Sequence, residues 1–155
     1  MGFDGTFSRI GVTIEEMQDV VGHPFPGGTY TIEPWENTLL CDVMEVPPLP
    51  DPLAHPSFLF HATLAGAGVR IPDIFELCRA ESDEAVRAGE YHWVLHRPLR
   101  VGETYRMSGG ITGVERKHGR RGGLMDVVSF QIDVHDETGA PVASTTSSWI
   151  FLRSS

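Results

Sequence analysis

The chain has few cysteines, few positive charges and no long apolar run. Its 155 residues include two cysteines, Cys41 and Cys78, and 12 Lys or Arg against 21 Asp or Glu. Two cysteines among apolar residues are typical of buried free thiols in a reducing compartment, and a single disulfide is the alternative. The net charge of −9 disfavours nucleic acid and anionic membranes as partners. No stretch reaches the about 18–20 apolar residues of a membrane span and no basic signal peptide begins the chain, so we expect a cytoplasmic protein.

The residues that are present fit one folded domain. Apolar residues make up 41% of the chain, enough to bury a core without a metal or a disulfide. We expect residues 1–11 to form an N-terminal arm and residues 12–155 a single domain. The glycines at 119–123 match no dinucleotide or phosphate-loop pattern. His92 and His96 share a strand face but have no third ligand, so the sequence predicts neither a cofactor nor a metal site.

One apolar stretch, residues 54–68, organises the rest of the sequence. It is apolar nearly all round and its second half consists of small residues. A helix that is apolar on every side must be buried on every side. Pro56 suits a first helical turn, and Gly66 and Gly68 suit its end. The stretch therefore predicts a buried central helix over about residues 56–68.

The remaining segments change from helical to alternating patterns along the chain. The helical signals are a capping box at Thr13 to Glu16, a helix from Pro34 to about Glu45, and a short helix over 71–78. Strand patterns are found at 29–32, 91–96, 104–116, 124–134 and 142–152, with a possible bulge at Gly109-Gly110, a hairpin tip at 117–123 and a polar, exposed segment at 81–88. Helices followed by a meander of long strands predict an α+β protein. A long antiparallel sheet wrapped around the central helix would be a hot-dog fold.

Three segments of the second half resemble a known family. They are residues 91–104 (YHWVLHRPLRVGET), 114–123 (VERKHGRRGG) and 134–143 (VHDETGAPVA). Their order resembles the MaoC-like hydratases and dehydratases, especially the N-terminal half of double-hot-dog proteins, over about residues 12–153. The resemblance implies a hot-dog fold and an acyl thioester substrate on CoA or acyl carrier protein. The implied reaction is hydration of trans-2-enoyl thioesters or the reverse dehydration of 3-hydroxyacyl thioesters.

The chain departs from that family at two positions that carry chemistry. Active members resemble one another in an Asp, any two residues, Pro, any residue, His motif, whose Asp and His activate water. Here the segment runs from Glu45 to Pro50, so a proline replaces the histidine. Active members also carry Ala-His-Gly, where a backbone N–H polarises the thioester carbonyl, whereas this chain has Ala54-His55-Pro56. The resemblance thus implies a non-catalytic half that pairs with a catalytic MaoC-like chain, or otherwise a homodimer.

Other constellations keep alternatives open. Asp51 and His55, with Glu45 as a further acid, would make a self-sufficient dehydratase or thioesterase if they formed a catalytic group. His23 begins a Pro-Phe-Pro-Gly stretch that is similar to the FabZ-type dehydratases, in which the acid comes from the neighbouring subunit's helix and Glu36 would be its counterpart. His61 on the central helix is interpreted as a packed core residue.

A basic cluster stands out in this acidic chain. Its members are Arg116, Lys117, Arg120 and Arg121. The cluster is either a solvated hairpin tip or a contact for the phosphates of CoA or a phosphopantetheine arm, because Arg forks suit phosphate oxygens. A hot-dog homo-oligomer that binds acyl thioesters without turning them over is the remaining functional alternative.

Overall fold

The computed structural model describes residues 11–121 and 123–154, so residues 1–10 of the predicted arm lie outside the described residues. The helical elements are α1 (Ile14–Gln18), α2 (Pro34–Val43), α3 (Phe58–Gly66), α4 (Ile71–Leu77) and the short 3-10 turn η1 (Asp83–Ala85). The strands are β1 (Gly28–Thr31), β2 (Val86–Leu95), β3 (Thr104–Gly119), β4 (Gly123–His135) and β5 (Pro141–Arg153). The predicted order of elements is confirmed.

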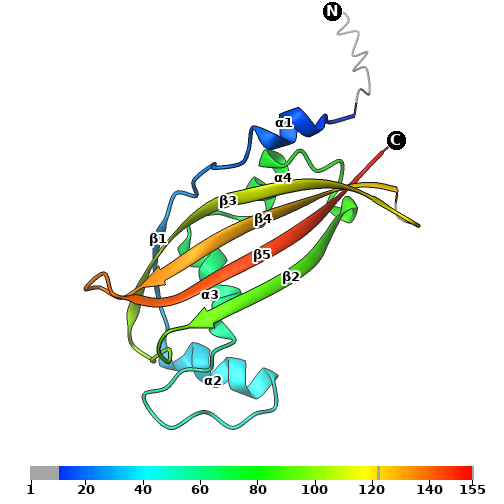
Figure 1. Ribbon diagram of the computed structural model, residues 1–155. Coiled ribbons are helices and arrows are strands. Elements are labelled where there is room, and N and C mark those ends of the chain that lie inside the picture. Colours follow the sequence, from blue (N-terminus) through cyan, green and yellow to red (C-terminus); the bar gives the residue numbers. More distant parts are fainter. Residues whose placement is uncertain (1–10, 122, 155) are drawn as a thin grey trace, which may run out of the picture.

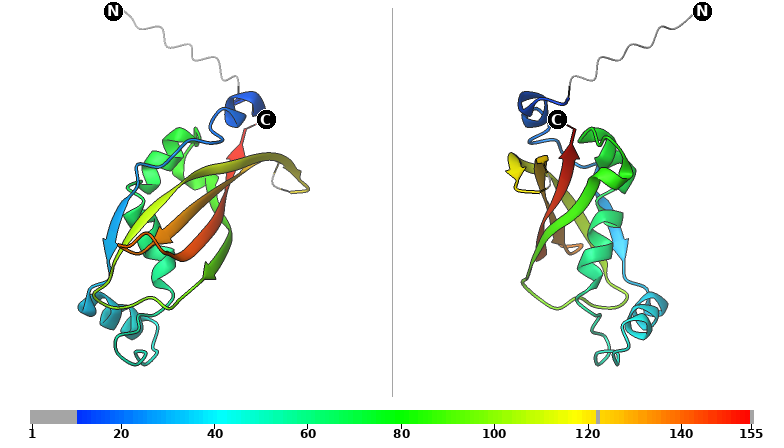
Figure 2. Two further views of the ribbon diagram at one scale, coloured as in Figure 1. Left: turned by 60° about the vertical axis from the view of Figure 1, so that its left-hand side comes forward. Right: turned by 90° about the vertical axis from the view of Figure 1, so that its right-hand side faces the viewer.

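The strands form one antiparallel sheet in the order β1-β3-β4-β5-β2. Figure 1 shows this curved sheet in front of α3, with α2 at one end and α1 and α4 at the other. In the edge-on view of Figure 2, α3 and α4 lie on the same side of the sheet. The sheet therefore wraps one face around α3, and the predicted α+β hot-dog architecture is confirmed.

The alternating residues of β4 and β5 build the core. Val128, Phe130, Ile132 and Val134 are buried, as their spacing predicts, while the residues between them are only partly covered. Phe130 sits at the centre, with its ring centroid 5.3 Å from that of Trp149 and 5.9 Å from that of Phe25. The edge-to-face geometry of both pairs is favourable for aromatic rings.

The central helix is shorter and less enclosed than its sequence predicts. It begins at Phe58 and ends at Gly66, and its buried residues face the sheet. The opposite side is uncovered: Phe60 is 52% exposed, and His61 and Ala65 are exposed as well. The prediction that all sides of this helix are buried is wrong for the single chain, because the sheet covers only one side of α3.

Two strand boundaries also differ from the prediction. β2 begins at Val86, inside the segment predicted to be polar and exposed, because this edge strand tolerates polar residues. β3 continues to Gly119, so the turn is shorter than the predicted tip at 117–123. The register shift in β3 lies between Ile111 and Gly113, and not at the preceding glycine pair. A Cβ at Gly110 would lie 2.4 Å from the His23 carbonyl oxygen, so this glycine serves a close approach of backbones.

The two cysteines are free and buried. This confirms the interpretation of Cys41 and Cys78 as core thiols, and burial raises the pKa of Cys78 to about 12. Among the described residues, no helix has both the length and the apolar character that crossing a bilayer requires.

We expect Gly28→Ala to lower the free energy of unfolding by about 1–3 kcal/mol, because overpacking forces backbone shifts. A Cβ at Gly28 would lie 2.7 Å from the Gly66 carbonyl oxygen, at the contact of β1 with α3. Gly113→Ala is the matched control, since nothing lies within 4 Å of its added Cβ. Urea titrations measure both, and equal midpoints for the two variants would contradict this packing.

Candidate functional site

The head of α3 is where the resemblance implies thioester chemistry. Pro56 has no N–H, and the Ser57 N–H donates to His55 Nδ1 at 3.1 Å. The Phe58 N–H donates to the His55 carbonyl oxygen at 3.2 Å. The first donors of this helix are therefore either absent or engaged within the chain. A carbonyl oxygen placed here would find no backbone donor prepared for it.

His55 is held by this local network. The backbone N–H of His55 donates to Oδ1 of Asn37, a buried residue of α2, at 3.0 Å. Because Nδ1 accepts from the Ser57 N–H, the neutral ring carries its proton on Nε2. The Ser57 hydroxyl lies 2.8 Å from the same Nδ1. These bonds tie α2 to the start of α3 and give His55 a structural role.

The acids of the proposed catalytic group lie apart from this network. Glu45 and Asp51 are both exposed, and Glu45 has a left-handed φ of 56° at the end of α2. Within residues 11–121 and 123–154, no hydrogen bond or ion pair joins either carboxylate to His55. The structure thus assembles no dyad from these three residues, and their catalytic roles stay predictions.

A largely apolar cavity of about 390 Å³ adjoins the head of α3. Its walls come from the segment before α3 and from the end of β2 with the residues that follow. They are Leu49, Leu53, Ala54, Pro56, Leu95, His96, Arg97, Pro98 and Leu99. This cavity lies beside the helix start to which the family resemblance assigns the thioester carbonyl.

The FabZ-type pair would join His23 of one subunit to Glu36 of another, so it stays a prediction, and within one chain the two residues lie apart. His23 is exposed and lines a cavity beside α4, whereas Glu36 lines a different cavity between α2 and α3. Glu36 accepts a hydrogen bond from the Tyr30 hydroxyl at 3.1 Å. His61, interpreted from the sequence as a core residue, is exposed and lines the same cavity as Glu36. That interpretation of His61 is wrong because this side of α3 is uncovered.

The basic cluster is split by the structure. Arg116 lies in β3, where its Nε donates to Asp126 Oδ1 at 2.7 Å and its Nη2 to the Val12 carbonyl at 2.7 Å. Lys117 also lies in β3 and pairs with Glu115 at 3.2 Å. Arg120 and Arg121 are exposed in the turn between β3 and β4. The tip thus presents two guanidinium groups to solvent, and Arg116 is committed to the fold.

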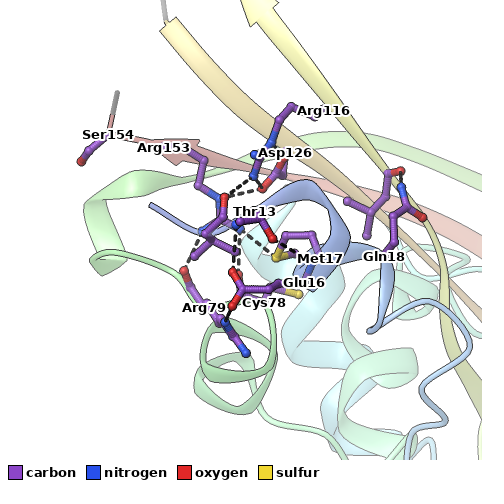
Figure 3. Close-up of polar contacts among 12 residues, drawn as sticks. Thr13, Glu16, Met17, Gln18, Cys78, Arg79, Arg116, Asp126, Arg153 and Ser154 are labelled. Atoms are coloured by element: carbon purple, nitrogen blue, oxygen red, sulfur yellow. Dashed lines mark hydrogen bonds and ion pairs between the residues drawn. The ribbon is translucent and has the colours of Figure 1, made fainter. Parts of the chain in front are cut away.

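Arg116 belongs to a buried cluster that sequence reasoning missed (Figure 3). Asp126 is fully buried and accepts from Arg116 and from Arg153, whose Nε lies 2.8 Å from Oδ2. Arg153 also donates to the carbonyl oxygens of Cys78 and Arg79, at 2.8 and 2.6 Å. Burial opposes ionisation of Asp126, but the two guanidinium groups outweigh it and hold the carboxyl pKa below its ordinary value.

The motif residues 91–104 and 134–143 meet in a second ion cluster. Arg97 Nη1 donates to Glu103 at 3.0 Å, and Arg97 Nη2 lies 3.3 Å from Asp136. The Tyr105 hydroxyl donates to Glu103 at 2.8 Å. Hydrogen bonds lower the pKa of the Asp136 carboxyl to about 2. The bond from the Thr138 hydroxyl has the largest effect, and the bonds from the backbone N–H groups of Ala140 and Thr138 add to it. These motif residues thus fix the ends of β2, β3 and β4.

We expect Asp126→Asn to cost about 3–5 kcal/mol of unfolding free energy at neutral pH, because Arg153 would keep a buried charge without its counter-charge. The carboxyl pKa is depressed in the folded chain, so its stabilisation is present above about pH 4 and is lost as pH falls through the folded pKa. The difference between wild type and variant should therefore shrink in acid. Urea unfolding across pH measures it, with Glu115→Gln in the exposed pair as control; a pH-independent difference would contradict the assignment.

A comparison with curated proteins finds no match. The ChsH1–ChsH2 complex from Mycobacterium tuberculosis is similar in structure, with a TM-score of 0.71, 17% identity and coverage of 92% of this chain and 95% of that chain. The HadBC complex, a 3R-hydroxyacyl-ACP dehydratase from the same organism, is also similar in structure. Its TM-score is 0.64 and its identity 14%, with coverage of 86% of this chain and 98% of that chain.

A third similar structure is a hot-dog-like protein from Thermanaerovibrio acidaminovorans, with a TM-score of 0.55, 12% identity and coverage of 87% of this chain and 83% of that chain. These likenesses confirm the hot-dog fold. The family model described as FAS1-like, dehydratase domain region, matches residues 50–145, which is more than half of the chain. The chain therefore has the hot-dog fold and belongs to the FAS1-like, dehydratase domain region family, which agrees with the dehydratase resemblance of its sequence.

Proposed function

We propose that this chain is the non-catalytic subunit of an enoyl-thioester hydratase or 3-hydroxyacyl-thioester dehydratase. Its partner would be a MaoC-like chain that supplies the catalytic Asp and His. The main support is the head of α3. There Pro56 has no backbone N–H, and the backbone N–H of Ser57 already donates to His55 Nδ1. Without a donor for the thioester carbonyl and without the family histidine, this subunit shapes the site while its partner performs the chemistry.

The exposed edge of β2 supports the pairing. β2 is the last strand of the sheet, with β5 on its inner side. The backbone N–H of His96 donates to the Val142 carbonyl oxygen. Because hydrogen-bonded and non-hydrogen-bonded residues alternate along an antiparallel pair, the backbone N–H and C=O groups of Leu95 and Trp93 point away from β5. Such an open ladder is a template for a strand of another chain. A partner strand placed there would continue the sheet.

The apolar side of α3 extends this surface. Phe60 is 52% exposed, and its ring centroid lies 5.1 Å from that of Tyr91 on β2. Val94 and Leu95 are 41% and 38% exposed on the same strand. A partner seated along β2 would cover these side chains. ChsH1–ChsH2 and HadBC are themselves complexes, which agrees with a hetero-oligomer.

We propose that this chain contacts the substrate at two places. The cavity at the head of α3 would receive the acyl thioester next to the partner's catalytic residues. Arg120 and Arg121, exposed at the β3–β4 turn, would contact phosphates of CoA or of a carrier's phosphopantetheine arm. Lys117 would add positive charge beside them, although it already pairs with Glu115.

We expect the purified chain to leave enoyl-CoA absorbance unchanged and the co-purified pair with a MaoC-like partner to consume it. Size exclusion of the co-expressed chains establishes whether they form one complex. Full activity of the chain alone would overturn the non-catalytic role.

His55→Ala separates the remaining alternatives in the same assay. A self-sufficient enzyme that uses His55 with Asp51 or Glu45 would lose its activity, whereas the pair proposed here would retain its chemistry. Tight acyl-CoA binding by a homo-oligomer, without turnover even when partners are added, would instead favour a binding protein.

We expect Leu95→Pro to raise the dissociation constant of the pair about tenfold or more, because it removes an outward N–H and leaves the ladder to β5 intact. Leu95→Ala is the matched control that shortens the side chain but keeps the N–H. Analytical ultracentrifugation measures association, and circular dichroism checks that each variant is folded. Equal association of the folded proline and alanine variants would rule out pairing through this edge.

A further inference from the structure

A second cavity, of about 360 Å³, lies between α2 and α3 and has no role in the function proposed above. Its lining is formed by Tyr30, Trp35, Glu36, Leu39, Leu40, Val43, Phe58 and His61. None of these residues lines the cavity at the head of α3. Pro56, just before α3, lines one cavity, and Phe58, the first residue of α3, lines the other.

The outer wall of this cavity is an apolar stripe on α2. Trp35, Leu39 and Val43 are spaced four residues apart and are 64%, 56% and 74% exposed. Apolar surface of this extent gains free energy when it is covered by a hydrocarbon group. The wall therefore suits an alkyl or cyclic hydrocarbon ligand.

The inner wall is polar and ordered. The Tyr30 hydroxyl donates to Glu36 Oε1 at 3.1 Å, and the Glu33 N–H donates to Glu36 Oε2 at 3.1 Å. Burial and, to a smaller extent, the hydrogen bond to Glu36 raise the pKa of Tyr30 to about 12. The phenol therefore stays protonated and remains the donor to Glu36. The ring of His61 meets the Tyr30 ring edge-on at 5.9 Å.

This polar wall has more acceptors than donors. A carboxylate accepts about four hydrogen bonds, and Glu36 receives two within the chain. In the described part of the chain, no hydrogen bond involves the His61 ring, which offers an acceptor nitrogen in its neutral form. A pure hydrocarbon would displace water from these acceptors without replacing its hydrogen bonds, whereas a hydroxyl on the ligand would donate to one of them.

We propose that this cavity binds the distal part of the acyl group and selects a substrate that carries a hydroxyl there. The inference rests on the proposed function, because the thioester end of the same acyl group would occupy the cavity at the head of α3. Trp35, Leu39 and Phe58 contact the hydrocarbon, and the hydroxyl donates its one proton either to Glu36 or to the acceptor nitrogen of His61. The substrate class is therefore a hydroxylated, otherwise apolar acyl thioester.

The test is a binding comparison of ω-hydroxydecanoyl-CoA with decanoyl-CoA, on the chain alone and on the co-purified pair. Quenching of Trp35 fluorescence reports occupancy of this cavity, with Trp35→Phe as the blank. We expect the hydroxylated ligand to bind about tenfold more tightly, as one hydrogen bond to a charged group provides. Equal affinities in both preparations, or tighter binding of decanoyl-CoA, would overturn the inference.

Two conservative variants assign the preference to this wall. Glu36→Gln keeps the shape and weakens the acceptor, and His61→Phe keeps the ring against Tyr30 without its nitrogens. Each should bring the two affinities closer together, whereas Leu39→Ala should weaken both ligands alike. A preference that both variants retain would mean that the hydroxyl binds elsewhere.

Turnover is measured separately from binding. If the co-purified pair shows no turnover of enoyl-CoA but binds the hydroxylated ligand more tightly, the proposed function is contradicted. If the pair turns over enoyl-CoA but shows no preference for the hydroxylated ligand, only this inference is contradicted.

Discussion

The buried Asp126 carboxylate holds together parts of the chain that are far apart in sequence. It binds Arg116 of β3 and Arg153 of β5, and these in turn hold the Val12 carbonyl before α1 and the carbonyls of Cys78 and Arg79 after α4. A charge with no exposed surface persists only when opposite charges and hydrogen bonds surround it. The three side chains therefore act as one unit that fastens the first and fourth helices to the sheet.

The two ends of the molecule consequently have different tasks. The Asp126 cluster secures the end of the sheet where the chain terminates, whereas the head of α3 and the cavities beside α2 lie at the other end (Figure 1). Arg97, Glu103 and Asp136 brace that second end, and Arg97 also lines the cavity at the head of α3. The family-resembling segments 91–104 and 134–143 thus do two things. Their ion pairs position the strand ends, and Leu95 to Leu99 line the cavity at the head of α3.

Most of the fold could be predicted from the sequence because its signals are local. Alternation in 124–134, the capping box at Thr13 and the apolar run at 54–68 each fix one element through short-range physics. Burial of α3 on all sides could not be predicted correctly, since it depends on what covers Phe60 and His61 in space. The Pro56 substitution was visible in the sequence, but the capture of the Ser57 N–H by His55 required coordinates. Asp126 and Arg153 do share the parity of their apolar neighbours in β4 and β5, a signal that could have marked them as buried.

The open edge of β2 also bears on the life of this chain in a cell. An edge strand of this length, with apolar Val94 and Leu95 beside it, can recruit any extended segment that it meets, including copies of itself in the wrong register. A chain synthesised without its partner would therefore be exposed to misassembly and to quality-control proteases for as long as that edge stays bare. Balanced synthesis of this chain and of the MaoC-like partner proposed above would limit that interval, and the amount of this protein that a cell maintains would then follow the supply of that partner.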